Sequence, residues 1–567
     1  MVDDNNINYL RHSASHLMAQ AVLELFPGTK LTIGPVTDEG FFYDFLPPEN
    51  FKEEDLKKIE NRMHEIAEKN LPIEFKEISK EEALKLYKDN KFKTELINGI
   101  EDEKVGISSQ GDFYDLCRGE HVSSTGKIKH FKLLGISGAY WRADKKNDAL
   151  QRISGTAFLS GKDLRAWEKQ KVEAAKYDHR KLGKELDLFS FHEEGPGFPF
   201  FHPKGQKVIQ LFTDYLRKEL ENAEYKEIQT PIALNDRLWR QSGHYAHYKD
   251  NMYFLKIDEH NYAMRPMNCP GGILIYKNRP HSYRELPIKM GEFGKVHRHE
   301  LSGVLHGLFR VRAFTIDDAH IFCTPNQIEE EVLGVLNFAK KIYKKFGFEN
   351  VVTVLSTKPE KAMGGDELWD KATNALHTAL KNAGEKYDID EGGGAFYGPK
   401  IDLHIKDSMG RLWQLGTIQV DFFMPENFDL TYVGSDGQKK RPVMIHRAIY
   451  GSFERFFGVL LEHYKGKLPF WLAPVQAKVL TVTDDQKDHA QKIYKQLKEN
   501  NIRVEFDASG DPLSQQIKTS QLEQIPWMVI IGKKEMENNT ITLRYREGKQ
   551  EFGLSFEDVI KKAKELS

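Results

Sequence analysis

The most regular pattern of apolar and polar positions lies at the start of the chain. Between residues 9 and 26, apolar side chains occupy positions 10, 14, 17, 18, 21, 22 and 25. Steps of three and four residues place these side chains on one face of a helix, and Pro27-Gly28 predicts its end. From there to about residue 158, short strands are expected to alternate with charged helices.

A long charged segment follows at residues 161–186, with no proline and no glycine between Gly161 and Gly183. This composition predicts a solvated connecting helix between two domains. The pattern changes again near residue 201, where residues 206–225 have the spacing of an amphipathic helix. Residues 295–314 and 399–423 each indicate two strands joined by a turn or loop. Adjacent strands connected in this way predict an antiparallel sheet and exclude a doubly wound parallel domain.

After residue 476 strands and helices alternate, which predicts a small α/β domain with a largely parallel sheet. The expected fold class is therefore multidomain α+β, and 567 residues suit three or four domains. The predicted boundaries are residues 1–160 for an N-terminal α+β domain, 161–186 for the connecting helix, 187–470 for the antiparallel-sheet domain and 471–567 for the C-terminal α/β domain.

Bulk properties narrow the possible functions only moderately. The formal net charge of −2 excludes a uniformly basic nucleic-acid binder but allows local basic patches. No run of about 20 apolar residues predicts a membrane helix, and the N-terminus has no apolar signal region. Three scattered cysteines cannot form a disulfide framework, which favours a reducing compartment such as the cytoplasm.

Two short motifs place histidines and a cysteine at the same spacing. His12 and His16 in HSASH are four residues apart and share a helix face, and Cys117 and His121 in DLCRGEH have the same separation. A metalloprotease pair would need Glu after the first histidine, where this chain has Ser13. The four side chains could bind a metal or line a hydrolytic pocket that positions a water molecule.

Arginines mark two candidate anion sites. Arg298, Arg310 and Arg312 fall on the predicted 295–314 hairpin, with Glu300 on the same strand face as Arg298. They could be surface charges or a phosphate clamp. Arg455 follows a Gly-Ser turn in the first turn of a predicted helix, which suits an anion but also an ordinary strand–turn–helix.

Cys269, in MNCPGG, is by itself more typical of a small buried apolar residue than of a reactive thiol. Its context changes this interpretation. MNCPG, DDAHIFC, GAFYGPKID, GTIQVDF and PVMIHRA resemble threonyl-tRNA synthetases, a family of class II aminoacyl-tRNA synthetases. TP at 230–231, HRHE at 297–300 and GSFERF at 451–456 resemble the three class II motifs, and RHSASHLMAQAV and DLCRGEH resemble that family's editing domain.

The resemblance implies a ligase that attaches threonine to tRNA(Thr) through a threonyl-adenylate. It implies one catalytic zinc per subunit, held at Cys269, His320 and His446, with Cys323 in the core. Zinc with three protein ligands keeps positions open for substrate, here the amino and hydroxyl groups of threonine. A site that binds a hydroxyl rejects valine by roughly 10⁴–10⁵, but it discriminates poorly against serine.

The remaining site residues also follow from the resemblance. Arg298 and Arg455 are the expected catalytic arginines, and His244 is expected to assist transfer to the tRNA. The expected ATP-binding residues are Arg298, Glu300, Arg310, Phe314, Gln414, Thr417 and Arg455, with Mg²⁺ accompanying the nucleotide. The expected threonine-binding residues are Asp318, Tyr397, Lys400 and Gln419. The expected residues of an editing pocket for Ser-tRNA(Thr) are His12, His16, Lys93, Cys117 and His121. Glu535 and Arg544 are expected to contact the anticodon through the C-terminal domain.

The sequence departs from the family pattern at several points. It starts at the editing domain, without the usual small ubiquitin-like domain before it. Gly272 replaces a common His, Ile316 a Gln, Glu120 a Pro and Gly510 an Asn. A non-catalytic relative would be expected to lose some of the motif arginines or zinc ligands, all of which are present. A stand-alone deacylase would need no catalytic core of this size. A cytoplasmic homodimer acting on threonine, ATP and tRNA(Thr), without a membrane partner, is expected.

Overall fold

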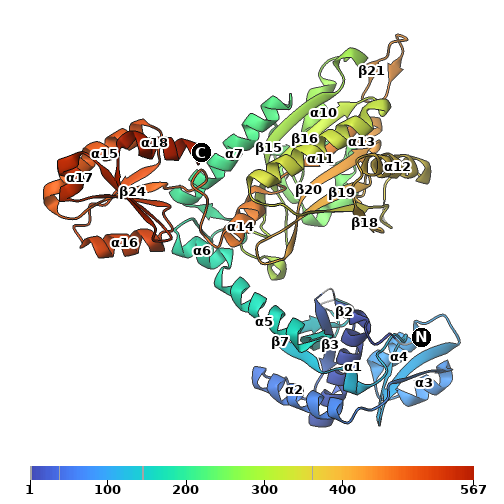
Figure 1. The fold of residues 1–567 in the computed structure, drawn as a ribbon. Coiled ribbons are helices and arrows are strands. Elements are labelled where there is room, and N and C mark those ends of the chain that lie inside the picture. Colours follow the sequence, from blue (N-terminus) through green and yellow to red (C-terminus); the bar gives the residue numbers. More distant parts are fainter. Residues whose placement is uncertain (1–2, 38, 144–145, 361, 567) are drawn as a thin grey trace. The chain divides into compact units, whose positions relative to one another are not determined.

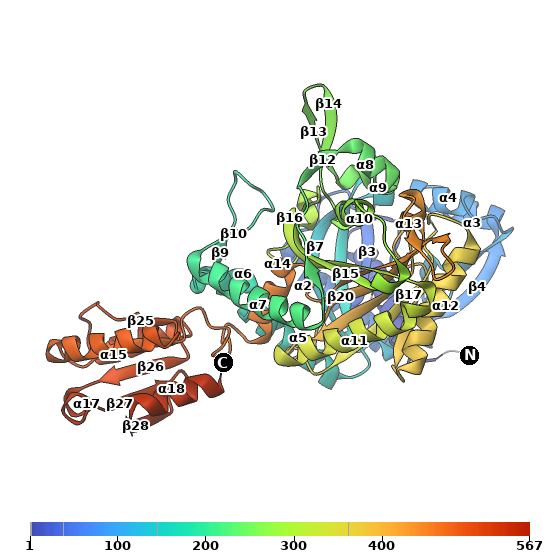
Figure 2. The ribbon, with the colours of Figure 1, turned by 90° about the horizontal axis from the view of Figure 1, so that it is seen from above.

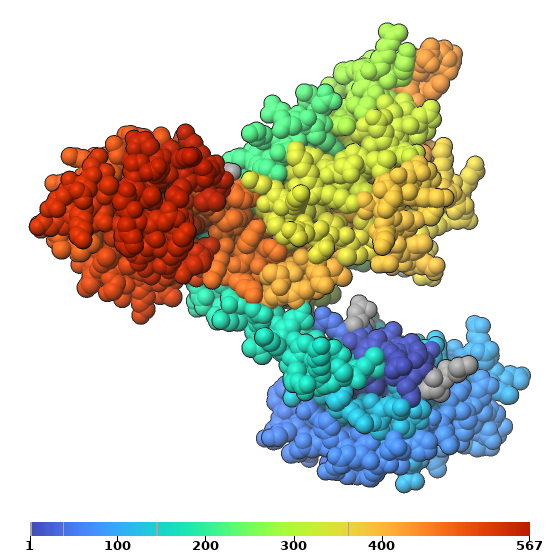
Figure 3. Space-filling view, viewed as in Figure 1, coloured from blue at the N-terminus to red at the C-terminus, as the bar shows by residue number. Residues whose placement is uncertain are grey.

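The computed structural model describes residues 3–37, 39–143, 146–360 and 362–566. The chain divides into two compact units, which we call unit 1 (Met1–Val172) and unit 2 (Glu173–Ser567). Figure 1 traces both units from the blue N-terminus to the red C-terminus. In the space-filling view, unit 1 and the C-terminal residues of unit 2 each gather in a closely packed body (Figure 3).

Unit 1 is built around the first predicted helix, which runs as α1 from Ile7 to Leu25. The Asn6 side chain caps it by accepting hydrogen bonds from the N–H groups of Asn8 and Tyr9. Small residues let α1 pack closely, so that even the polar Ser13 and His16 are buried. The helix lies against α2, β3 and β8. The polar Ser13, His16 and Gln20 are consequently buried inside unit 1, whereas Asn8 and Glu24 near the helix ends are exposed.

The sheets of unit 1 have strand orders β1-β3-β8-β7, with β2 added to β3, and β4-β5-β6. The further elements of unit 1 are β1 Lys30–Leu31, β2 Val36–Thr37, β3 Gly40–Leu46, α2 Glu53–Glu68, β4 Glu74–Ser79, α3 Lys80–Leu86, α4 Lys91–Asn98, β5 Lys104–Gln110, β6 Phe113–Leu116, β7 His130–Tyr140 and β8 Ala149–Phe158.

The predicted single connecting helix is wrong in one respect. It is two helices, α5 (Gly161–Lys176) and α6 (His179–Glu185), because Asp178 caps a new helix by accepting the N–H of Arg180. The α5 helix buries no residue, as predicted for a solvated segment. The α6 helix instead packs closely: a Cβ on Gly183 would lie 2.4 Å from the Phe189 ring. The second half of the segment therefore belongs to the core of unit 2.

The antiparallel sheet predicted for unit 2 is confirmed, with eight strands in the order β11-β15-β16-β23-β20-β19-β17-β18. Only its edge pairs, β11 with β15 and β17 with β18, are parallel. The α11 helix packs over the central strands β23 and β20. The β13–β14 hairpin belongs to a separate three-stranded sheet with β12, and Figure 2 shows it projecting beside α8. Every residue of the central strand β23 is buried, so polar side chains there require partners.

The elements of unit 2 that carry this sheet follow. They are β9 Phe189–Ser190, β10 Phe200–Phe201, α7 Pro203–Asn222, β11 Lys226–Glu227, β12 Ala233–Asn235, α8 Asp236–Gln241, α9 His244–Tyr248, β13 Tyr253–Ile257, β14 His260–Met264, α10 Cys269–Lys277, β15 Ile288–His297, β16 Ala313–Cys323, α11 Ile328–Lys345, β17 Val351–Ser356, α12 Asp366–Asn382, β18 Tyr387–Asp390, β19 Lys400–Lys406, β20 Leu412–Asp421, α13 Phe423–Asn427, β21 Tyr432–Val433, β22 Lys439–Lys440, β23 Val443–Ala448 and α14 Phe453–His463.

The C-terminal part of unit 2 has its own five-stranded sheet, ordered β25-β24-β26-β27-β28. Its first three strands are parallel as predicted, but β27 and β28 pair antiparallel, so the sheet is mixed. The elements are β24 Ala477–Thr481, α15 Lys487–Glu499, β25 Val504–Phe506, α16 Leu513–Leu522, β26 Trp527–Ile531, α17 Lys533–Asn538, β27 Ile541–Tyr545, β28 Gln550–Leu554 and α18 Phe556–Glu565. Among the described residues, no helix combines the length and apolarity needed to cross a membrane.

Candidate active site and editing pocket

The three predicted zinc ligands come together although they lie far apart in the sequence. Cys269 is the first residue of α10, whereas His320 and His446 lie directly opposite each other on β16 and β23. The ligand atoms of all three lie within 4.8 Å of one another, and all three side chains are buried. One thiol and two imidazoles form a donor set that suits Zn²⁺.

The polar contacts of this cluster fit a metal. His446 Nε2 lies 2.9 Å from Asp421 Oδ2, so Nε2 carries the proton and Nδ1 keeps a free lone pair. His320 Nε2 is buried without a hydrogen-bond partner in the described part of the chain. Burial, together with Asp318 and Asp421, raises the pKa of the Cys269 thiol well above its usual value. A divalent cation would satisfy the orphaned imidazole and stabilise the thiolate.

All seven predicted ATP-binding residues line one cavity of about 520 Å³. It lies between the ends of β15, β16 and β20 and the start of α14. The sequence pattern predicts Arg298, Glu300 and Arg310 on the strands of a hairpin, and this prediction is wrong. The strand β15 ends at His297 and β16 begins only at Ala313. All three residues lie in the loop between these strands, where Glu300 Oε2 accepts a hydrogen bond from Arg310 Nε at 3.0 Å.

The cavity concentrates positive charge. Burial, followed by the nearby Arg310 and Arg298, lowers the pKa of Arg455. Glu300 is the only carboxylate among the lining residues that the structure describes. Arg298 lies 5.0 Å from the centre of the Phe314 ring, so cation and aromatic face are adjacent. Three guanidinium groups that face one cavity with a single acid favour a polyanionic ligand.

The predicted threonine-binding residues are hydrogen-bonded to one another or to neighbouring polar groups. Tyr397 donates to Gln419 Oε1 at 2.5 Å, and Asp318 Oδ2 accepts from Asn268 Nδ2 at 3.2 Å. Lys400 is held by Asp402 at 2.5 Å. The other oxygen of Asp402 accepts from Gln414 Nε2 at 2.6 Å.

His244, expected to assist transfer, is fully buried, and its Nε2 lies 3.9 Å from Cys269 Sγ. Burial, then the neighbouring His446, lowers its pKa to about 3, so the imidazole is neutral at pH 7. Its Nδ1 lies 2.8 Å from Ser242 Oγ.

In unit 1 the two histidine and cysteine motifs meet. Cys117 Sγ lies 3.1 Å from His121 Nε2 and 3.7 Å from His12 Nε2, and His12 stacks on His121 with ring centres 4.3 Å apart. His16 packs edge-on against His12. An adjoining cavity of about 710 Å³ is lined by His12, His16, Cys117 and Lys93, among others.

The protonation states in this pocket follow from Ser13. Its hydroxyl donates to Tyr9 O, so it must accept from His121 Nδ1, and His121 Nε2 is left as an acceptor. Burial lowers the pKa of His121 to about 2 and that of His16 well below its usual value. Burial also raises the pKa of Cys117 to about 11. At neutral pH the pocket thus holds a thiol and uncharged imidazoles, which orient water and do not attack as a thiolate.

Four acidic or phenolic partners of the site were not predicted. Lys93 forms a buried ion pair with Asp115 at 2.5 Å and donates to Tyr43 Oη at 3.0 Å. Asp402 holds Lys400, and Asp421 holds His446. The sequence contained a signal for Asp115 and Asp421: each lies two residues from a predicted site residue, Cys117 and Gln419. On a strand, that spacing places Asp421 on the same face as Gln419.

The four positions at which the sequence departs from the family pattern differ in their structural environment. A Cβ on Gly272 would lie 3.3 Å from His320 Nδ1, so a larger residue would press on this imidazole. Ile316 lines the cavity of the arginines. Glu120 has φ +68°, which proline cannot adopt. Gly510 has φ +74° in open space.

The two predicted anticodon residues lie apart from these pockets. Glu535 caps α17 by accepting the N–H of Gly532 at 3.0 Å, and it also accepts from Thr542 Oγ1 at 2.7 Å. Arg544 lies on β27, and its Nε has no hydrogen-bond partner in the described ranges. Both Glu535 oxygens are already engaged, whereas Arg544 Nε is buried without a partner among the described residues.

Three family models match separate parts of this chain. Residues 253–464 match the family described as tRNA synthetase class II core domain (G, H, P, S and T). Residues 472–566 match an anticodon binding domain, and residues 105–154 match the threonyl and alanyl tRNA synthetase second additional domain. The core is that of a class II aminoacyl-tRNA synthetase.

Whole-chain relatives identify the family. A threonine–tRNA ligase of Clostridium tetani is 56% identical over 96% of this chain and 86% of its own length. That of Carboxydothermus hydrogenoformans is 54% identical over the same shares. A Cryptosporidium parvum threonyl-tRNA synthetase structure, described as its RNA binding domain, matches at 42% identity with a TM-score of 0.67, covering 69% of this chain and 98% of that one. The chain belongs to the threonine–tRNA ligase family.

Proposed function

We propose that this protein attaches threonine to tRNA(Thr) through a threonyl-adenylate and hydrolyses mischarged Ser-tRNA(Thr) in a separate pocket. The convergence of Cys269, His320 and His446 on one point carries the choice of amino acid. These residues would hold a zinc ion. When bound, zinc supplies open positions for an oxygen and a nitrogen donor of the substrate. Family membership and a core with its own anticodon-binding domain support tRNA as the acceptor.

Activation requires no protein nucleophile. The carboxylate of threonine attacks the α-phosphorus of ATP, and pyrophosphate leaves with the electron pair of the broken P–O bond. The protein positions the reactants and neutralises charge. In our assignment Arg298 contacts the α-phosphate, Arg310 and Arg455 contact the rest of the triphosphate together with Mg²⁺, and Phe314 stacks on adenine. Glu300 accepts a hydrogen bond from the adenine amine, with Gln414 and Thr417 beside it.

Threonine is held by its charged and polar groups. Asp318 attracts the ammonium group, and Tyr397 and Gln419 fix its orientation through their mutual hydrogen bond at 2.5 Å. Lys400 lies beside them, paired with Asp402. In the transfer step, a hydroxyl of the terminal tRNA ribose displaces AMP from the adenylate. Neutral His244 can accept the proton of that hydroxyl.

Editing uses the uncharged cluster of unit 1. The uncharged His12 and His16 rings, which line the cavity, provide acceptors for a water molecule that attacks the seryl ester, while His121 Nε2 holds the Cys117 thiol at 3.1 Å. Lys93 supplies a cation held by Asp115. The larger threonine is excluded by size or displaces the water. Glu535 and Arg544 are proposed to contact the anticodon. Domains at residues 1–160, 187–470 and 471–567, a homodimer and action in the cytoplasm complete the proposal.

The decisive experiment is ATP–pyrophosphate exchange with threonine, serine and valine, with zinc content measured on the same preparations. Threonine and serine should support exchange and valine should not. The three cysteines form a matched set: Cys269→Ser should lose zinc and exchange, whereas Cys323→Ala and Cys117→Ala should keep both. Cys117→Ala should lose only the hydrolysis of Ser-tRNA(Thr). Active protein without zinc, or an equal loss of zinc in all three variants, would refute the amino-acid assignment.

A further inference from the structure

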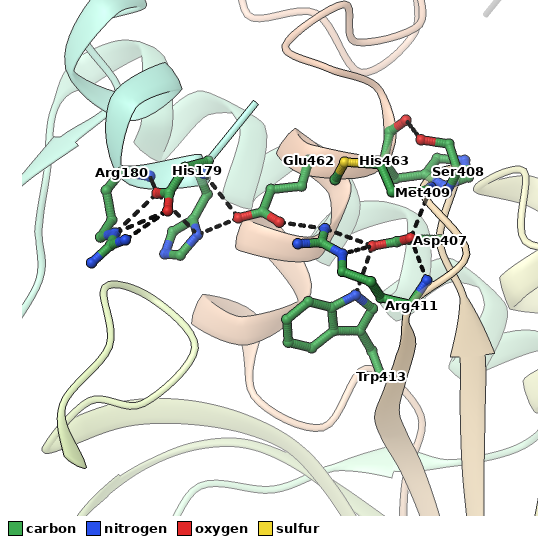
Figure 4. A network of polar contacts seen from close by, with 10 residues as sticks. His179, Arg180, Asp407, Ser408, Met409, Arg411, Trp413, Glu462 and His463 are labelled. Carbon is green, nitrogen blue, oxygen red and sulfur yellow. Dashed lines mark hydrogen bonds and ion pairs between the residues drawn. The ribbon is translucent and has the colours of Figure 1, made fainter. Parts of the chain in front are cut away.

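One fully buried histidine takes no part in the chemistry proposed above. His179 is the first residue of α6, and its ring packs against Phe309 with ring centres 4.0 Å apart. Its Nδ1 lies 2.7 Å from Glu462 Oε1 (Figure 4). Its Nε2 accepts the backbone N–H of Leu308 at 2.9 Å. Two ring atoms thus bridge α14 and the loop between β15 and β16.

A metal ion is the first alternative, because Asp178, His179 and Glu462 present ligand atoms within 4.8 Å of one another. The hydrogen bonds exclude it. The Leu308 N–H occupies the lone pair of Nε2, and the carboxylate of Glu462 requires the proton on Nδ1. The ring is therefore the neutral Nδ1–H tautomer, and neither nitrogen can coordinate an ion.

Glu462 is itself rigidly held. Its second oxygen binds Arg411, which also donates from Nε to Asp407 Oδ2 at 2.8 Å. Asp407 Oδ2 also accepts from Trp413 Nε1 at 2.8 Å. Figure 4 shows Glu462 between His179 on one side and Arg411 on the other. The position of the His179 ring is consequently fixed by a buried, charge-assisted network and not by packing alone.

The loop that His179 contacts is part of the nucleotide cavity. His306 and Arg310 close a tight turn through backbone hydrogen bonds, with Gly307 at φ +47°. A Cβ on Gly307 would lie 2.2 Å from His179 Nε2, so the turn and the ring fit without space between them. Phe309 and Arg310 both line the cavity, and Arg455 Nε donates to Phe309 O at 3.2 Å.

We propose that His179 is a positioning residue for ATP: by accepting the Leu308 N–H, it fixes the 306–310 turn so that Arg310 and Arg455 point at the triphosphate. The proposal rests on the assigned function of that cavity. The α6 helix, which follows the solvated α5 helix, thereby contributes to nucleotide binding.

The expected effect appears in ATP binding. Without the acceptor, the buried Leu308 N–H has no partner, and the turn can satisfy it only by moving towards water. ATP then binds only the fraction of molecules whose turn is in place, and the apparent affinity falls by that fraction. A buried donor left without a partner reduces this fraction to roughly a tenth or less.

Two substitutions separate the two hydrogen bonds of the ring. In His179→Gln, the amide oxygen reaches the position of Nε2 and can accept from Leu308, but the bond to Glu462 is lost. In His179→Asn, the shorter amide can donate to Glu462 but cannot reach Leu308. We expect the KM for ATP to rise about tenfold or more in His179→Asn and to stay within about threefold of wild type in His179→Gln. The KM for threonine and the hydrolysis of Ser-tRNA(Thr) should not change in either.

A matched pair of glycines tests the same contact from the other side. Gly307→Ala pushes the turn off His179, whereas Gly303→Ala, in the same loop, meets nothing within 4 Å. The first should raise the KM for ATP about as much as His179→Asn, and the second should not. If both His179 variants fail to fold, this pair still tests whether displacing the turn weakens ATP binding, although alanine at φ +47° strains the turn as well as pressing on His179.

Several results would overturn the proposal. Thermal melts lowered in both His179 variants with an unchanged KM for ATP would mean that the residue only stabilises the fold. Equal ATP defects in His179→Gln and His179→Asn, or in the two glycine variants, would exclude the Leu308 contact. Failure of the proposed function is distinguishable, because the wild-type protein would then show no exchange with any amino acid. Direct calorimetric titration with ATP would still test His179.

Discussion

Asp421→Asn is a sensitive test of the zinc site, because it changes a residue that would not touch the metal. Asp421 Oδ2 accepts the Nε2–H of His446 at 2.9 Å, and Oδ1 accepts the N–H groups of Phe423 and Met424 at 2.7 and 3.0 Å. Asparagine can keep the two backbone bonds through its carbonyl oxygen. Its amide group cannot accept from His446, so only the link to the imidazole is broken.

The magnitude follows from two independent arguments. Hydrogen bonds to charged groups contribute about 1.5–3 kcal/mol, which corresponds to roughly 10–100-fold in an equilibrium constant. Loss of a carboxylate that orients a metal-bound histidine typically weakens metal affinity by ~10–100-fold. We therefore expect zinc affinity to fall by about this factor while the protein remains folded.

The assay is a competition titration with a zinc chelator, combined with threonine-dependent ATP–pyrophosphate exchange. Asp421→Asn should lose exchange at low free zinc and regain it when zinc is added. Asp436→Asn, on the exposed β21–β22 hairpin, provides the control. An affinity equal to wild type, or a loss of exchange that zinc cannot restore, would contradict the role assigned to Asp421.

Three further predictions concern unit 1. Because the unfolded chain binds a proton at His121 near pH 6.5 while the folded chain does so only at about 2, stability is lost as the pH falls below 6.5. At pH 5 the loss is about 2 kcal/mol, and urea unfolding of His121→Gln should depend less on pH. Lys93→Met should destabilise unit 1 by about 3–5 kcal/mol by leaving Asp115 buried and unpaired, and adding Asp115→Asn should recover most of this in melts. Proline cannot adopt the φ of +68° found at Glu120, so Glu120→Pro should slow the hydrolysis of Ser-tRNA(Thr) without changing exchange. Glu120→Gly can adopt this φ and should hydrolyse Ser-tRNA(Thr) at the wild-type rate. Equal hydrolysis rates in the two variants would contradict the loop geometry.

The parts of the fold that could be predicted from sequence are those with local causes. The α1 helix and the hairpin of β19 and β20 follow from periodicity and turn chemistry within a few residues. The break between α5 and α6 could not be predicted in this way. The charged pattern continues across it, and only the capping of α6 by Asp178 and its burial against unit 2 decide the outcome.

The site residues also divide into those with a local sequence signal and those without one. His320 and His446 came from family resemblance, because no local pattern distinguishes a ligand histidine from a core histidine. Tyr43 was missed because its contact with Lys93 joins β3 to α4, and no local pattern shows that these two elements lie side by side. The placement of Arg298 beyond the end of β15 was missed because strand pairing, and not the alternation of side chains, determines where a strand stops.

The pairing of His320 directly across from His446 has a consequence for how this protein can change over time. Because side chains alternate on a strand, inserting or deleting one residue in β16 or β23 would turn every later side chain to the opposite face. The sheet could still form, but one imidazole would then point into the helices behind it. Substitutions can accumulate on these two strands, but insertions and deletions within them would separate the two histidines. The number of residues in β16 and in β23 should therefore stay constant among functional relatives.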